Sequence, residues 1–232
     1  MGEPPGTEVA SVERETRDDA APIAAAAALA LAVLALVSRS QGWELVHGSG
    51  WWLWLLPAIP FAVLVVVLAG VRRLDRHDIR RDVVAVLLAV IVLISLGALG
   101  LLVASLLAPP AEGITGPQLL HCGITVWLTN VVAFGLAFWE LDAGGPIRRA
   151  RTARGAPDFQ FPQDENPGLA GDGPWRPRLF DYLYVSLTNS TAFSPTDTLP
   201  LTRPAKALMA VESTISIVTL LVVAARAINI LD

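Results

Sequence analysis

The stretch DYLYVSLTNSTAFSPTDTLP at residues 181–200, followed by the apolar segment Ala205–Leu231, decides the fold of this chain. Its first part can form a short amphipathic helix, because Ser186, Asn189 and Ser190 fall on one helical face. This helix is too short and too polar to cross a bilayer. The stretch therefore predicts a short helix, a tight polar loop and then a membrane-spanning helix.

The composition of the whole chain indicates a membrane protein. Of its 232 residues 53% are hydrophobic and only 16% are charged, and the mean hydropathy is +0.55. A soluble protein carries about 25% charged residues. In this chain long stretches of sequence also contain no charged residue. The composition favours the bacterial cytoplasmic membrane, with membrane lipids as partners and no nucleic acid. A single cysteine, Cys122, excludes an internal disulfide.

Five apolar segments are long enough to cross the hydrocarbon core as helices. They are Ala20–Ser38, Trp51–Gly70, Val83–Ala108, Leu119–Trp139 and Ala205–Leu231. None alternates between polar and apolar residues, so a β-barrel is not expected. We predict an all-α membrane protein with five transmembrane helices plus a short re-entrant pore-type helix and loop. Pro57 and Pro60 should loosen the first turns of the second span.

The chain divides into four parts. Residues 1–19 are acidic and contain prolines, and we expect a disordered tail. Residues 20–139 form a four-helix transmembrane region, 140–178 a polar loop rich in Gly and Pro, and 179–232 the pore-like helix, loop and last helix. Five arginines between residues 72 and 81 place that loop in the cytoplasm.

Residues 181–231 resemble the pore module of potassium-channel-type (ion channel 2) proteins, where a Thr-x-Gly-Tyr-Gly-Asp loop follows the short helix. Thr191 and Asp197 keep the frame of that loop. Ser194 and Thr196 stand where the family has glycine, and Pro195 stands where it has tyrosine. The resemblance implies a pore fold and a homotetramer, since one loop cannot close a pore.

A filter of backbone carbonyl groups is not expected here. Such filters depend on glycines, whereas Pro195 lacks an N–H and Thr196 resists positive φ. Side-chain chemistry remains, from the hydroxyl groups of Thr191, Ser194, Thr196 and Thr198 and the carboxylate of Asp197. Four copies would give a ring of acids that favours monovalent cations weakly. A non-conducting scaffold or sensor that keeps a degenerate channel fold is the alternative.

The whole chain also resembles a domain-of-unknown-function family of bacterial membrane proteins. The shared features are the arginine-rich loop, the element Asp158–Pro162 and the aromatic start of the short helix at 181–184. This resemblance implies a fold and no activity. The arginines of the 140–178 segment place that segment in the cytoplasm. The pore loop would therefore enter the membrane from the cytoplasmic side, as in glutamate-receptor channels. Otherwise one charge assignment is wrong, or residues 180–198 lie along the interface.

Lys206 lies at the start of the last span, and two further charged residues fall inside it. A charge there is a functional candidate, so Glu212 either has a role in function or faces the bundle and bonds neighbouring hydroxyl groups. Arg226 lies near the far end and can reach the headgroups. His121, Thr129 and Asn130 could join Glu140 and Asp142 in a proton path, although contacts between helices are the simpler interpretation. No spacing predicts a metal site, a cofactor or a catalytic group, and an enzyme is not expected.

Overall fold

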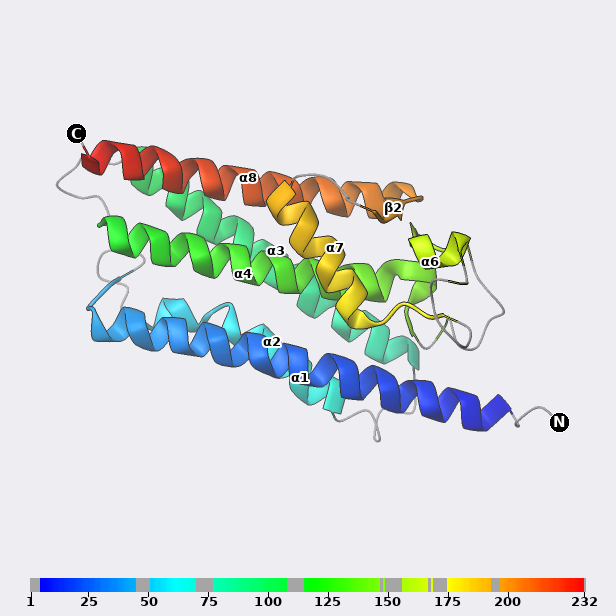
Figure 1. The fold of residues 1–232 in the computed structure, drawn as a ribbon. Helices are drawn as coiled ribbons and strands as arrows, with labels where there is room; N and C mark the ends of the chain where they lie inside the picture. Colours follow the sequence, from blue (N-terminus) through cyan, green and yellow to red (C-terminus); the bar gives the residue numbers. More distant parts are fainter. Residues whose placement is uncertain are drawn as a thin grey trace.

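The computed structural model describes residues 5–44, 51–69, 77–107, 115–146, 148, 156–166, 168, 175–192 and 197–231. Most of these residues are helical (Figure 1). In chain order the elements are α1 (Pro5–Ser40), η1 (Trp51–Leu55), α2 (Ala58–Ala69), α3 (His77–Leu107), α4 (Gly116–Leu141), η3 (Asp142–Gly144), β1 (Phe159–Gln160), α6 (Pro162–Glu165), α7 (Leu179–Ala192), β2 (Leu199–Pro200) and α8 (Arg203–Leu231).

Four of the described helices are long and apolar enough to cross a membrane. Their spans are Ala20–Ser40, Asp82–Ala104, Gly116–Gly144 and Arg203–Ala225. The expected span Trp51–Gly70 is instead a 3₁₀ helix, η1, and a 12-residue helix, α2. Pro57 lies in the turn between them and Pro60 in the first turn of α2, as expected of residues that interrupt helices. The chain is therefore a multi-pass α-helical membrane protein by the length and composition of four helices.

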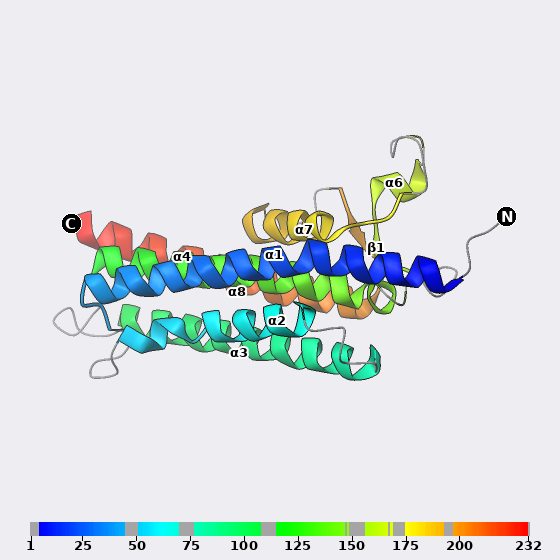
Figure 2. The ribbon, with the colours of Figure 1, turned by 90° about the horizontal axis from the view of Figure 1, so that it is seen from below.

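Helix α4 is the centre of the bundle. Its membrane-spanning window is 78% buried, against 22–33% in the other three spans. Helices α1, α3, α7 and α8 all contact it. In Figures 1 and 2 the long helices run roughly parallel to one axis, and Figure 2 shows α2 and α3 together on one side. Helix α7 is the exception, because it starts at the end of the bundle near α6 and reaches only part of the way along α8.

Two glycines let other helices approach α4 closely. A Cβ atom on Gly123 would lie 2.7 Å from Cγ2 of Val223 in α8. One on Gly135 would lie 2.6 Å from Cδ2 and 3.0 Å from Cα of Leu183 in α7. Small residues allow such close contacts between helices within membranes. The absence of a side chain at Gly135 thus allows α7 to lie this close to α4.

Two of the expected segments differ from the structure. Helix α1 begins at Pro5 and so includes most of the 1–19 segment, where a disordered tail was expected. That segment contains several Glu and Arg residues, which favour helices, and it continues directly into a long helix. The expected loop 140–178 contains η3, β1 and α6. Its strand β1 pairs antiparallel with β2, with Phe159 opposite Pro200 and Gln160 opposite Leu199.

Candidate functional site

Helix α7 turns its polar face inward. Ser186, Asn189 and Ser190 are buried, whereas Tyr184 and Leu187 are 46% and 39% exposed. The face that the sequence predicted to be polar exists, but it faces the bundle and leaves apolar side chains outside. Hydrocarbon surroundings favour this arrangement, because a polar group without a partner in lipid is unfavourable.

The inward face of α7 meets Glu212, whose side chain is fully buried on α8. Asn189 Nδ2 donates to Glu212 Oε2 over 2.6 Å, and Ser190 Oγ donates to Oε1 over 3.0 Å. The Ser186 hydroxyl group contacts Oε1 and also lies 2.7 Å from the carbonyl oxygen of Val131 in α4. Three polar side chains of α7 therefore surround both carboxyl oxygens of a residue inside a membrane-spanning helix.

Further contacts extend this cluster onto α4 and along α8. Asn130 Nδ2 donates to the carbonyl oxygen of Glu212 over 3.1 Å and contacts Ser216 Oγ at 2.9 Å. Ser213 Oγ donates to Asn189 Oδ1 over 3.0 Å. We call Ser186, Asn189, Ser190, Asn130, Ser216, Ser213 and Glu212 the Glu212 cluster. It joins α4, α7 and α8 at one depth of the bundle.

A second set of contacts holds the beginning of α7. Tyr182 is fully buried, and its hydroxyl group donates to Asp142 Oδ2 over 2.5 Å. The other oxygen, Asp142 Oδ1, accepts from the N–H of Asp158 over 2.6 Å and from that of Phe159 over 3.2 Å. Asp142 thus ties the end of α4 to both β1 and α7.

Asp158 completes this connection at the start of α8. Its Oδ2 accepts from the N–H of Ala143 over 3.0 Å, and its Oδ1 accepts from the hydroxyl group of Thr202. The N–H of Leu201 donates to the Asp158 carbonyl group over 2.8 Å. The beginning of α8 and the end of α4 therefore lie at the same end of the bundle as β1 and β2 (Figure 1).

Polar side chains cap the first turns of α7 and α8. Thr202 precedes α8, and its Oγ1 accepts from the N–H of Ala205 over 3.4 Å. Asp181 lies in the first turn of α7. Its carboxylate accepts from the N–H of Arg178 over 2.6 Å. Acidic residues in the third helical position make this backward contact to the cap residue.

The predicted pore-loop residues fall in three groups. Ser194, Pro195 and Thr196 lie outside the described residues. Thr191 is exposed at the end of α7, and its hydroxyl group donates to its own helix at Leu187 O over 2.8 Å. Asp197 is exposed, and Thr198 beside it is buried.

Three of the remaining polar candidates, Asn130, Asp142 and His121, have different partners. Asn130 belongs to the Glu212 cluster and Asp142 to the contact with Tyr182. His121 lies near Trp43 and Trp54, with ring centroids 5.3 and 5.0 Å apart. Asn130 therefore acts as a contact between helices. Arg226 lies in α8, but its side chain is outside the described residues.

Sequence reasoning missed the partners of Glu212 and the role of Tyr182. One of the two interpretations given for Glu212 was that it faces the bundle and bonds neighbouring hydroxyl groups. Glu212 does face the bundle, but its hydroxyl partners are Ser186 and Ser190 of α7. The repeated polar positions 186, 189 and 190 were a usable signal, because they define one face of a helix. Nothing local in the sequence pairs Tyr182 with Asp142, which lies 40 positions earlier.

No family model, curated protein or solved structure matches this chain. The resemblance to potassium-channel-type pore modules remains a prediction from residues 181–231.

Proposed function

We propose that this chain is the subunit of a channel-like protein of the bacterial cytoplasmic membrane, with α7, residues 193–198 and α8 as a re-entrant pore module. Four copies would surround one pathway for monovalent cations with weak selectivity. The pore-lining groups would be Thr191 at the end of α7 and a ring of four Asp197 carboxylates. Ser194 and Thr196 complete the proposed lining.

One observation carries this proposal: α7 extends inward to the depth of Glu212, and the chain then returns to the end from which α7 started. Glu212 lies nine residues after Arg203, so Asn189 contacts α8 about 14 Å from its beginning. By Leu199 the chain pairs with β1 at the bundle end. A polar helix that ends inside a membrane protein, followed by a short return, supports a re-entrant loop.

The Glu212 cluster supplies the rigidity that such a module needs. Non-helical backbone at membrane depth survives only where protein or a water-filled cavity surrounds it. Because α7 is fixed through Tyr182 at its start and through Asn189 near its end, the loop begins from a defined position. We assign Glu212 a positioning role and not a place in the ion pathway, since its side chain is fully buried.

Planar-bilayer recordings of the purified full chain test this function. Wild type should carry a cation current, and Asp197→Asn should lower its conductance or cation preference severalfold because the ring of acids is lost. Glu165→Gln is the matched control, since it removes an exposed acid on α6 at the same end of the bundle. Equal effects of both substitutions would contradict a role for Asp197 in the pathway.

A non-conducting scaffold or sensor is the second candidate. It is favoured by the internal use of the polar face of α7, since Ser186, Asn189 and Ser190 all contact groups of the same subunit. A silent wild type at high protein density would favour this candidate. Native mass spectrometry separates the two further, because a strict monomer cannot form a pore of four loops.

A further inference from the structure

The Glu212 carboxyl group lies far from water. Its side chain is 0% exposed, and it lies about 14 Å from the beginning of α8 at Arg203, near the middle of a hydrocarbon core of about 30 Å. The side chains that contact it, Ser186, Asn189 and Ser190, are all neutral. An ionised carboxylate in such a place is strongly unfavourable unless a cation lies beside it.

No charged or titratable side chain among the described residues contacts this carboxyl group. Helices α3, α4 and α7 pack against α8. On these helices such residues have other partners, are exposed, or lie about two turns or more from the contacts of Glu212. They are His121, Cys122 and Glu140 on α4, Asp181, Tyr182 and Tyr184 on α7, and residues 77–82 on α3. On α8 itself Arg203 and Lys206 are exposed, and Arg226 lies about four turns further on.

The contacts of Ser186 indicate that the carboxyl group carries a hydrogen atom. The Ser186 hydroxyl group has one hydrogen but two oxygen neighbours, the carbonyl oxygen of Val131 at 2.7 Å and Oε1 of Glu212. A carbonyl oxygen only accepts, so Ser186 donates to Val131 and the hydrogen between Ser186 and Oε1 comes from Glu212. The neutral acid also accepts from Ser190 at Oε1 and from Asn189 at Oε2, which gives both oxygens a partner.

We propose that Glu212 is a proton-binding site, in which a proton taken up from water and held on Oε1 joins α8 to α7 through Ser186. A metal ion does not fit between these groups, because the oxygens of Ser186 and Ser190 are already at hydrogen-bond distance from Oε1. The site is built from contacts within one subunit. It therefore stands whether or not the protein conducts ions.

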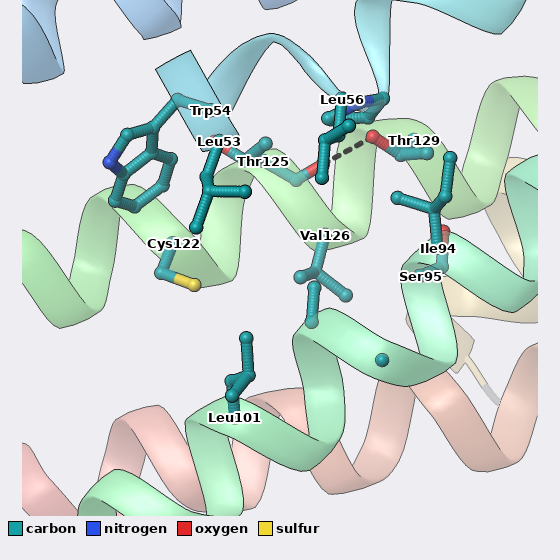
Figure 3. Close-up of a pocket in the computed structure, with 13 residues that line it drawn as sticks. Leu53, Trp54, Leu56, Ile94, Ser95, Leu101, Cys122, Thr125, Val126 and Thr129 are labelled. Carbon is teal, nitrogen blue, oxygen red and sulfur yellow. Dashed lines mark hydrogen bonds between the residues drawn. The ribbon is translucent and has the colours of Figure 1, made fainter. Parts of the chain in front are cut away.

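Exchange of this proton with water requires α7 to move. Side chains of α7 cover both carboxyl oxygens. The pocket of about 410 Å³ between η1, α3 and α4, shown in Figure 3, is lined by no residue of the Glu212 cluster and brings no water to it. Loss of the proton is therefore linked to separation of α7 from α8. Because the closed arrangement binds one more proton than the open one, opening becomes more favourable as the pH rises.

Infrared spectroscopy of the full chain in lipid nanodiscs tests for the proton. At neutral pH exposed carboxyl groups are ionised, so wild type should show the carbonyl stretching band of a neutral carboxylic acid, and Glu212→Gln should lose intensity from that band. Glu165→Gln is the control and should keep the full band, since it removes an exposed acid on α6. Equal bands in wild type and Glu212→Gln would show that Glu212 is ionised and would overturn the proposal.

Two serine variants test the direction of the hydrogen bond. Ser186→Ala removes the acceptor of the acid proton, so the band should shift to higher frequency and keep its intensity. Ser213→Ala is the control, because Ser213 contacts Asn189 and not the carboxyl group. It should leave the band in place. A band that stays in place in Ser186→Ala as well would contradict the contact through Ser186.

Hydrogen exchange of the α7 backbone amides tests the link to α7. After correction for the intrinsic exchange rate, the opening equilibrium of wild type should rise by up to tenfold per pH unit, because one proton is released per opening. Glu212→Gln cannot release a proton, and its opening should be independent of pH. Opening of wild type that does not change with pH would overturn the link. Gel filtration of each variant checks that it is folded.

Discussion

Asn189 Nδ2 lies 2.6 Å from Glu212 Oε2, and this contact joins a helix that is too short to span a membrane to one that is long enough. The side chain of Glu212 is fully buried, and the hydroxyl groups of Ser186 and Ser190 also contact its carboxyl group. It therefore sets the depth at which α7 ends and residues 193–196 begin. Four predictions concern this arrangement and the contacts that support it.

Glu212→Ala should destabilise the protein strongly. It removes from a buried place the carboxyl oxygens that Ser186, Asn189 and Ser190 all contact, which we expect to cost about 2–4 kcal/mol. Glu212→Gln keeps one acceptor oxygen and the size of the side chain, so about 1 kcal/mol is expected. The free energy of unfolding in mixed detergent micelles measures both.

Thr214→Ala is the control for these two variants. Thr214 lies two residues further along α8 and is exposed, and among the described residues its hydroxyl group bonds only to its own helix at Ala210 O. Its loss should change the free energy of unfolding by less than about 0.5 kcal/mol. If Glu212→Ala is no worse than Thr214→Ala, the Glu212 cluster does not hold α7.

Tyr182→Phe should loosen the beginning of α7. The variant keeps the ring contacts with Phe159 and Phe161 but removes the donor to Asp142, at an expected cost of about 1.5–3 kcal/mol. Tyr184→Phe, on the exposed side of the same helix, should have little effect. Hydrogen exchange shows whether the backbone amides of α7 and β1 lose protection in Tyr182→Phe. Equal protection in both variants would argue against the contact between Tyr182 and Asp142.

Gly135→Ala should displace α7 from α4. Its Cβ atom would meet Leu183 at 2.6 Å, so we expect a loss of about 1–3 kcal/mol from overpacking. Gly100→Ala on α3 has open space and should gain up to about 1 kcal/mol from helix propensity. Thermal unfolding of the two variants in one detergent should therefore shift in opposite directions. A shift in the same direction would contradict the close approach.

A disulfide between residues 160 and 199 should form readily. Gln160 and Leu199 are opposite each other in the β1–β2 pair, and paired residues in antiparallel strands have Cα atoms about 4.5–5.5 Å apart, within disulfide range. We expect Gln160→Cys with Leu199→Cys, in a Cys122→Ser background, to oxidise almost completely. Gln163→Cys with Leu199→Cys is the control. A shift in gel mobility after proteolysis reports the bond, and its failure would place β2 away from the bundle end.

The sequence by itself determined the class of this protein and much of its local structure. Long apolar segments with few charged residues predict helices in lipid, and four of them are present in the structure. Pro57 interrupts the second segment because proline lacks the N–H that a helix needs. The polar face of α7 and the cap at Thr202 also follow from local patterns, which depend on residues only a few positions apart.

Only the tertiary structure decided which groups Glu212 and Asp142 contact and in which direction the polar face of α7 points. Ser186 and Glu212 are 26 positions apart, and Tyr182 and Asp142 are 40 apart. Such pairs depend on how α7 packs against α4, which in turn depends on the absence of a side chain at Gly135. Local periodicity defines the face of a helix, but the position of its neighbours decides whether that face meets lipid or protein.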